Sequence, residues 1–242
     1  MTDKHTLTYF DNETPSYWPG LYSELLRVLV ALGREGDCLV DVGCGTGTTL
    51  QLIQQRTAIR QLSGIDPSLN SLKEASDKGD FELIAGSILD DGLVASIGPR
   101  FRFAVLAFLL HHLIGRGRND SREKSRAALI NAARLVCDRG YLLILEEVVH
   151  PDLVAAYTFY LKKLLSSLTL KRIDPLKTGY SLGAPVVSYF TARQLRETVK
   201  TTPDLRVASV DVREKSLSAL MRVAGITKLA WLTLVANKCP PR

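Results

Sequence analysis

Two histidines and two glutamates are the residues of this chain best suited to moving protons. His111 and His112 follow one apolar run, and Glu146 and Glu147 follow another. Histidine titrates near neutral pH, and a carboxylate can also act as a general base. We therefore expect His111, His112 or Glu146 to act in catalysis. The alternative interpretation is that the histidines support a loop and the glutamates cap a strand or make ion pairs.

A glycine-rich turn is the second chemical feature. The residues Asp41-Val42-Gly43-Cys44-Gly45-Thr46-Gly47 lie between an apolar run, 38–40, and a helix-compatible segment, Thr48 to Arg56. Glycines let the backbone turn sharply and expose N–H groups to a ligand at the start of a helix. A dinucleotide-binding turn would need a third glycine or alanine where Thr48 stands. Asp41 would also meet a cation better than a pyrophosphate.

An acidic residue ends the next apolar run, about 20 positions further on. Asp66 closes the run 62–66, and Pro67 starts a new segment. A carboxylate at this place can accept hydrogen bonds from both hydroxyls of a ribose. Three more apolar runs follow, at residues 81–85, 103–108 and 140–145.

These motifs, spanning residues 40–149, resemble the class I S-adenosylmethionine-dependent methyltransferases. The resemblance implies S-adenosylmethionine as the cofactor and no metal. It implies these cofactor-binding residues: Asp41, Gly43, Cys44, Gly45, Gly47, Asp66, Pro67, Ser87, Ile88 and Phe108. The chain departs from the family at Ser87, where relatives often carry an aspartate for the adenine. It departs again at Ala104, where the early aspartate of the fourth strand is missing.

The order of elements predicts an α/β fold. We expect a doubly wound, mostly parallel seven-stranded sheet with a C-terminal antiparallel hairpin, 205–212 with 230–236, and a helical insertion after strand 5. The whole chain, 1–242, is expected to form one class I methyltransferase domain. Its parts are an N-terminal lid and helix (1–36), a cofactor-binding core (37–149), a substrate-side insertion (150–190) and a C-terminal helix and β-hairpin (191–242).

The insertion is where we expect substrate specificity to lie. Leu153 to Leu170 has a helical pattern that is apolar nearly all round, so it is predicted to be buried, to cover a pocket or to meet a partner. Tyr157 and Tyr160 lie three apart on one helical face and are candidate substrate-binding residues. Two more candidates, Tyr17 and Trp18, belong to an aromatic segment that in relatives often folds over the cofactor. Packing of the first helix onto the sheet is an equally open role for them.

Helix starts can be predicted at two places. Thr191 and Gln194 form a capping box for a helix through Val199. Asp120 and Glu123 have a similar spacing within a basic stretch that contains Arg116, Arg118, Arg122, Lys124 and Arg126. We interpret this stretch mainly as a solvated loop and helix start, and keep a site for an acidic substrate or polynucleotide as the alternative.

Composition bounds the remaining possibilities. A chain of 242 residues with 46% hydrophobic and 23% charged residues is typical of a globular protein. It shows neither an apolar signal-peptide core nor a membrane span, so we expect a cytoplasmic protein. Its four cysteines lack disulfide or metal-ligand spacing. A homodimer is left open.

The predicted function is methylation of an oxygen or carbon atom of a small metabolite. Two alternatives remain: an RNA-modifying methyltransferase that uses the positive charge of the chain, +6, or a non-catalytic scaffold subunit that keeps the cofactor site. Nucleic acid is the less favoured partner, because the chain has no aromatic stacking platform for single strands.

Overall fold

A seven-stranded mixed sheet forms the centre of the molecule in the computed structural model, which describes residues 19–167 and 186–240. The strand order is β3-β2-β1-β4-β5-β7-β6, and β1 to β5 pair in parallel. β7 runs antiparallel to both β5 and β6, which confirms the predicted terminal hairpin. The bounds are β1 Cys38–Val42, β2 Gln61–Asp66, β3 Glu82–Ala85, β4 Phe101–Ala107, β5 Val136–His150, β6 Leu205–Glu214 and β7 Lys228–Lys238.

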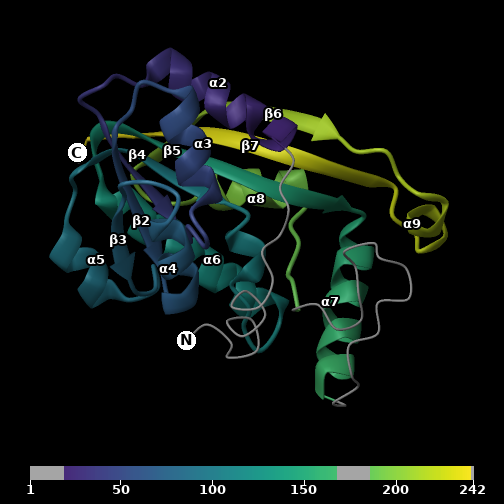
Figure 1. The fold of residues 1–242 in the computed structure, drawn as a ribbon. Coiled ribbons are helices and arrows are strands. Elements are labelled where there is room, and N and C mark those ends of the chain that lie inside the picture. Colours follow the sequence, from purple (N-terminus) through teal and green to yellow (C-terminus); the bar gives the residue numbers. More distant parts are fainter. Residues whose placement is uncertain (1–18, 168–185, 241–242) are drawn as a thin grey trace.

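Helices cover both faces of this sheet (Figure 1). A short 3-10 turn, η1 (Pro19–Tyr22), leads into the first of them, and a second one, η2 (Leu110–His112), follows β4. The α-helices are α2 Ser23–Leu32, α3 Thr48–Arg56, α4 Leu69–Ser76, α5 Asp91–Ile97, α6 Arg118–Leu135, α7 Asp152–Ser167, α8 Ala192–Lys200 and α9 Ala219–Val223. Figure 1 shows α7 beyond the end of β5, apart from the helices that cover the sheet.

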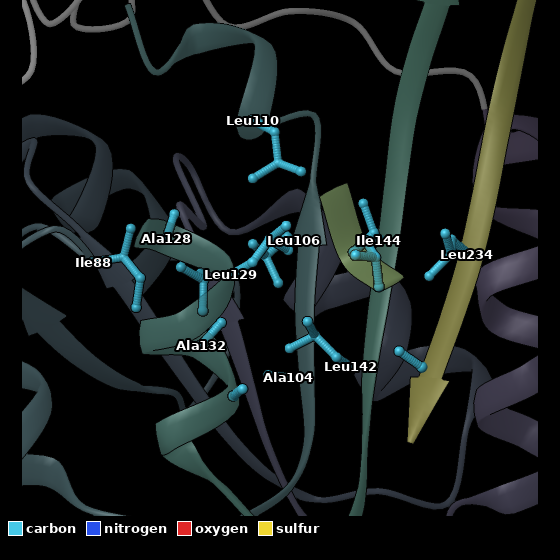
Figure 2. Packing of buried hydrophobic residues seen from close by; sticks show 14 of the residues in the cluster. Ile88, Ala104, Leu106, Leu110, Ala128, Leu129, Ala132, Leu142, Ile144 and Leu234 are labelled. Atoms are coloured by element: carbon cyan, nitrogen blue, oxygen red, sulfur yellow. The ribbon is translucent and has the colours of Figure 1, made fainter. Parts of the chain in front are cut away.

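Two apolar cores lie on opposite faces of the sheet, because successive strand residues point to opposite sides. On one face, Leu106 of β4 and Ile144 of β5 pack against Leu129 of α6, as Figure 2 shows. On the other face, the neighbouring strand residues Val105 and Leu145 pack in a cluster with α2 and α3. Because both faces of these central strands are covered, almost every residue along them has to be apolar. The apolar runs in β1, β4 and β5 meet this requirement.

Local signals set several helix boundaries. The Thr191 side chain accepts a hydrogen bond from the Gln194 backbone N–H, and the Gln194 side chain accepts one from the Thr191 N–H, so the predicted capping box is confirmed. The prediction for Asp120 was wrong. α6 begins at Arg118, and Asp120 lies in its first turn, where its carboxylate accepts a hydrogen bond from the Arg116 N–H at 2.7 Å.

β5 is longer than its apolar run indicated. It was expected to end at Leu145, but it continues to His150 because β7 pairs with it from Tyr141 to His150. The last residue pair between β4 and β5 joins Ala107 to Leu145. Glu146 therefore lies within a strand, just past the end of β4, and is not the strand-terminal residue that the sequence indicated.

Candidate active site

The glycine-rich turn connects β1 to α3 at the carboxyl edge of the sheet. Gly43, Gly45 and Gly47 all have positive φ angles, of 73°, 51° and 75°. A side chain at Gly43 would also bring its Cβ within 2.7 Å of a methyl carbon of Leu109. Only glycine fits such a backbone without strain. The turn lies where β1 borders both β2 and β4, the switch point at which open α/β sheets bind ligands.

Asp41 is a buried acid beneath this turn. The residue is only 1% exposed. Within the described residues, neither oxygen of its carboxylate has a hydrogen-bond partner. The pKa of Asp41 is raised from 3.8 to about 8. Burial is the larger cause, and the nearby negative charge of Asp66 is the smaller one. An unpaired buried carboxylate is costly and favours a cationic partner. The site thus suits a ligand that brings a positive charge.

Asp66 ends β2 beside the turn, as predicted. One of its carboxylate oxygens accepts a hydrogen bond from the Gly45 N–H at 2.9 Å, and the other accepts one from the Ser68 N–H at 2.8 Å. These two bonds fix the carboxylate across the start of the loop that contains Pro67. A carboxylate offers about four lone-pair positions, so two backbone hydrogen bonds do not by themselves use up its capacity to accept.

The other predicted cofactor residues fall around the same edge. Gly86 donates its N–H to the Asp66 carbonyl at 3.0 Å, which holds Ser87 and Ile88 next to β2. Phe108 follows β4 in a left-handed conformation, and its ring meets that of Tyr22 edge to face. Cys44 differs from the others: its thiol is buried in the core, and burial raises its pKa.

A histidine from η2, the turn that follows β4, and a glutamate from the neighbouring strand β5 meet at this edge. Glu146 of β5 is fully buried, and one of its oxygens lies 2.5 Å from His111 Nδ1. The other oxygen accepts a hydrogen bond from the Leu110 backbone N–H at 2.6 Å. Because the carboxylate accepts from both sides, it favours the tautomer with the proton on Nδ1 and leaves Nε2 as an acceptor. Two of the predicted catalytic residues thus form a dyad.

His112 has a different environment from its neighbour. Its ring centroid is 4.1 Å from that of His111. Burial lowers the pKa of His112 well below 6.5, and the charges of His111 and Lys162 act in the same direction. The structure therefore favours a neutral His112 at physiological pH. Lys162, on α7, was not predicted from the sequence.

The chain that returns from the insertion covers the dyad. The Tyr189 ring stacks on the His111 ring with centroids 5.4 Å apart, and the Ser188 N–H donates to the His111 carbonyl at 2.9 Å. Phe190 continues this contact by accepting a hydrogen bond from the Val149 N–H. His111 is consequently only 7% exposed.

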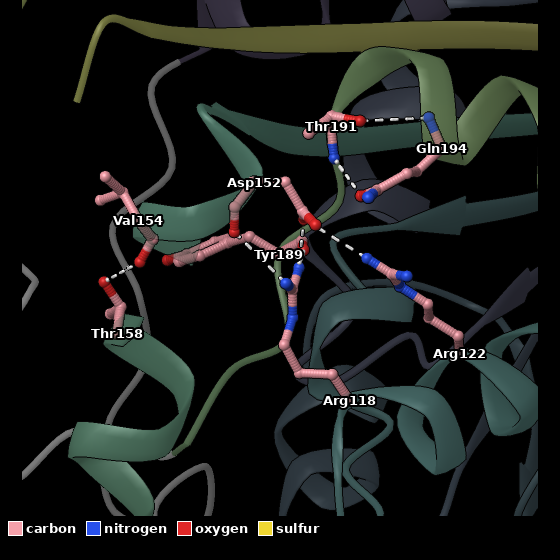
Figure 3. Close-up of polar contacts among 8 residues, drawn as sticks. All are labelled: Arg118, Arg122, Asp152, Val154, Thr158, Tyr189, Thr191 and Gln194. Atoms are coloured by element: carbon pink, nitrogen blue, oxygen red, sulfur yellow. Dashed lines mark hydrogen bonds and ion pairs between the residues drawn. The ribbon is translucent and has the colours of Figure 1, made fainter. Parts of the chain in front are cut away.

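An ion-pair cluster holds the start of α7 to α6 (Figure 3). Arg118 is buried, and its guanidinium lies 2.8 Å from the Asp152 carboxylate and donates to the Tyr189 carbonyl at 3.0 Å. Arg122 approaches the same carboxylate at 3.3 Å. Arg118 thus joins three segments that are distant in the sequence.

The basic stretch is therefore mostly used inside the molecule, and the prediction of a solvated loop was wrong for Arg118. Lys124 donates to the Ile114 carbonyl at 2.7 Å, and Arg126 donates to the Thr201 carbonyl at 3.0 Å. Arg116 is exposed. The sequence could not show these contacts, because their acceptors are backbone carbonyls and a distant aspartate.

Of the four predicted substrate-side aromatic residues, the structure describes Tyr157 and Tyr160. Tyr157 and Tyr160 lie on the outer side of α7, 68% and 55% exposed. Tyr17 and Trp18 lie outside the described residues. A role for these four in acceptor binding stays a prediction.

Two further observations concern composition and helices. The four cysteines are free thiols, and no group of three potential metal ligands occurs in the part of the chain that the structure describes. Over the same residues, each helix is too short or too polar to cross a membrane.

Comparison with known proteins identifies related sequences and folds. A family model described as "Methyltransferase domain" matches residues 16–202, which is more than half of the chain. No curated protein matches the sequence significantly.

Three solved structures illustrate the likeness of the fold. A SAM-dependent methyltransferase from Methanosarcina mazei is 17% identical, with a TM-score of 0.61, over 94% of this chain and 100% of that one. Magnesium protoporphyrin IX methyltransferase from Synechocystis, with bound SAH, is 15% identical with a TM-score of 0.61, over 98% and 97%. The cyclase SpnF is 15% identical with a TM-score of 0.60, over 95% and 85%.

Proposed function

This chain belongs to the family of methyltransferase domains, enzymes whose cofactor is S-adenosylmethionine, and on that premise we propose that it methylates a hydroxyl oxygen of a small metabolite. The observation that carries the proposal is the buried dyad of His111 and Glu146 beside the predicted cofactor turn. Transfer to a hydroxyl requires removal of one proton, and this dyad is suited to accept it.

The residues at the carboxyl edge fit the cofactor. Asp41 offers an unpaired buried carboxylate for the ammonium of the amino-acid part, and the turn Gly43 to Gly47 leaves room for close approach to the backbone. Asp66 would accept hydrogen bonds from the ribose hydroxyls, and Ser87, Ile88 and Phe108 would border the rest of the nucleoside.

The protein has to align the acceptor and take up its proton. S-adenosylmethionine, when bound, supplies an electrophilic methyl group on a sulfonium. His111 would accept the hydroxyl proton at Nε2 while Glu146 keeps Nδ1 as a donor and stabilises the resulting imidazolium. Tyr189 stacks on the imidazole and limits the access of water to it, and the Ser188 N–H, which donates to the His111 backbone carbonyl, holds this segment in place.

Two other functions are supported less well. Arg118 is buried and paired with Asp152, and Lys124 and Arg126 are held by backbone carbonyls, so these side chains are less available for contacts with the phosphates of a polynucleotide. The cyclase among the solved structures is a reminder that this fold alone does not determine a reaction. A scaffold subunit would not need an aligned histidine–carboxylate pair, so the dyad favours an enzyme.

Calorimetry and a transfer assay test the proposal. Asp66→Ala should weaken S-adenosylmethionine binding about tenfold or more, because a hydrogen bond to a charged group contributes about 1.5–3 kcal/mol. With methyl-labelled cofactor and a panel of phenols and other hydroxyl compounds, His111→Asn should lose transfer yet keep cofactor binding. His150→Asn is the control, because His150 lies four positions beyond Glu146, at the end of β5 where it pairs with Lys228 of β7. Tighter binding of a nicotinamide dinucleotide, or unchanged transfer in His111→Asn, would contradict the proposal.

A further inference from the structure

The outer side of α7 carries an exposed apolar stripe. It consists of four residues that are each more than half exposed: Leu153, Tyr157, Tyr160 and Leu164. These residues are spaced four, three and four positions apart, so their side chains project from one side of the helix. Phe159 and Lys162 are buried on the opposite side. The stripe is therefore the side of α7 that faces away from its own core.

Large exposed apolar residues are otherwise scattered over the described part of the chain. α2, α4, β6 and α9 each carry one, and these are Val30, Leu69, Val212 and Val223. α7 carries four along about three turns of helix. Single exposed apolar residues are normal on a protein surface, whereas a continuous patch marks a site of interaction. The stripe therefore requires a partner surface.

The stripe is the same in both directions along the helix. Leucines stand at its ends and tyrosines in its centre, and the spacing is symmetric. If a second copy of α7 lies antiparallel on it, Leu153 meets Leu164 of the second copy. Tyr157 likewise meets Tyr160 of the second copy. Each contact then occurs twice around a two-fold axis, as in the isologous interface of a symmetric dimer.

Helix geometry also favours this arrangement. Alternating steps of four and three residues are the spacing by which helices pack in coiled coils. An antiparallel pair places the positive end of each helix dipole beside the negative end of the other. Tyrosine is enriched in the centre of protein interfaces, which is the place that Tyr157 and Tyr160 would take.

The area of the stripe is close to what a specific dimer needs. An aromatic side chain can bury about 150–250 Å², so four large side chains that are more than half exposed offer roughly 400 Å² per copy. Two copies would bury about 800 Å² through these residues alone, and the atoms beside them on both helices would add to it. Specific interfaces begin near about 1,000 Å² in total. A second copy would thus form a dimer of moderate affinity.

We propose that this chain forms a homodimer through antiparallel contact of two α7 helices, with the apolar stripe at the centre of the interface. A second copy fits better than an unrelated protein, because the stripe matches itself in residue type and in spacing. The inference concerns the outer side of α7 and does not depend on the proposed reaction.

Sedimentation velocity of the full chain tests the dimer. Between about 1 and about 200 µM, the wild type should pass from monomer to dimer, because an interface at the lower end of the size range gives a roughly micromolar Kd. Leu153→Glu and Leu164→Glu each place a charge in the apolar contact and should raise this Kd about tenfold or more. Leu69→Glu, which changes an exposed leucine of α4, is the control and should dimerise as the wild type does.

Disulfide trapping tests the direction of pairing. Leu153 and Leu164 lie about 16 Å apart along one helix, whereas a disulfide needs Cα atoms within about 7 Å. A mixture of Leu153→Cys and Leu164→Cys copies should therefore cross-link under mild oxidation, and neither variant should cross-link alone. The wild type controls for the four native thiols.

Three results would overturn the inference. The first is a wild type that stays monomeric at all these concentrations, which would assign the stripe to another part of the chain or to a different partner. The second is dimerisation of both glutamate variants with the affinity of the wild type. The third is cross-linking of either cysteine variant with itself and not with the other, which would indicate a parallel pair or a different interface.

Discussion

The Glu146 carboxylate controls which nitrogen of His111 carries a proton. Its two oxygens are both used as acceptors, one by the Leu110 N–H and one by the imidazole. A neutral amide in place of this carboxylate has only one acceptor oxygen, so it can accept from the Leu110 N–H or from His111 Nδ1 but not present an oxygen to each. The dyad is therefore sensitive to a substitution that alters neither the size nor the position of the side chain.

Glu146→Gln should lower methyl transfer by roughly tenfold to a thousandfold. If the amide oxygen keeps the bond to Leu110, the amide NH₂ faces His111 Nδ1 and forces the proton onto Nε2, which removes the base. Steady-state kinetics against pH, together with cofactor calorimetry, measures this. Glu147→Gln is the matched control, because Glu147 pairs with Lys215 instead. Equal losses in the two variants would count against the dyad.

Asp41→Asn should stabilise the cofactor-free protein, and more so as pH rises. Folding raises the pKa of Asp41 from 3.8 to about 8, so the folded state holds a proton that the unfolded state has released. The associated stability is complete below pH 3.8 and is lost as pH rises through about 8. Thermal melting from acidic to mildly alkaline pH should show the gap between wild type and Asp41→Asn widening.

The control for this measurement is Asp80→Asn, which replaces an exposed aspartate. Its melting temperature should differ from that of the wild type by a small, pH-independent amount. S-adenosylmethionine should stabilise the wild type more than Asp41→Asn, because the substitution removes the negative partner of the ammonium. A constant gap over the whole pH range would refute the assigned role of Asp41.

At the residue scale, the sequence indicated the members of the site better than their contacts. His111 and Glu146 each follow an apolar run, and both were predicted to be catalytic. Their contact could not be predicted, because it depends on the register in which Ala107 pairs with Leu145. Lys162 was missed because its helix was interpreted as apolar nearly all round, and one lysine does not change that pattern.

At the scale of elements, α7 depends on a small set of polar contacts for its position. Arg118 connects it to α6 through Asp152 and to the returning chain through the Tyr189 carbonyl. Tyr189 stacks on His111. A change at Arg118 should therefore reach the dyad without touching the cofactor turn.

Arg118→Met should loosen α7, raise the KM for the acceptor several-fold and leave the cofactor Kd nearly unchanged. The substitution leaves the Asp152 carboxylate and the Tyr189 carbonyl without their main donor, at a cost of about 1–3 kcal/mol. Limited proteolysis within residues 150–190 should become faster. Arg134→Met is the control, since its ion pair with Asp91 is exposed. Resistance to proteolysis equal to that of the wild type would disprove the anchoring role.

Elements with strong local signals were predicted well. α3 has the predicted bounds, and the Thr191–Gln194 capping box starts α8 as expected. The start of α6 and the end of β5 were wrong for a physical reason. Asp120 bonds backward to Arg116 from inside the helix, and β5 is extended by pairing with β7. Neither effect is visible in a local pattern.

At the scale of the whole molecule, net charge is a poor guide to the partner. The chain carries a charge of +6, but Arg118 and Arg122 share the Asp152 carboxylate, and Lys124 and Arg126 bond to backbone carbonyls. Asp152 offsets part of the charge of Arg118 and Arg122, whereas Lys124 and Arg126 keep their charge but are held in place by the carbonyls.

Turnover should consequently depend only weakly on salt. Binding to a polynucleotide falls steeply with salt because phosphate contacts release counter-ions, whereas binding of a small metabolite does not. Between about 50 and about 500 mM potassium chloride, we expect kcat/KM to change by less than roughly tenfold. The measurement uses the best acceptor from the labelled-methyl panel. A decline of several orders of magnitude would favour the RNA-modifying alternative.

The long pairing of β5 with β7 fixes the position of Glu146, whereas α7, which follows β5, lies outside this pairing. Ten residue pairs join β5 to β7, and Glu146 lies within them. α7 follows directly on β5 and is anchored by the Arg118–Asp152 cluster and by packing of Ala155 against Val149 and Leu229. Insertions and substitutions in α7 can therefore accumulate over evolution without disturbing the register that aligns the proton acceptor. A lineage with this architecture can acquire a new substrate while it inherits its chemistry unchanged.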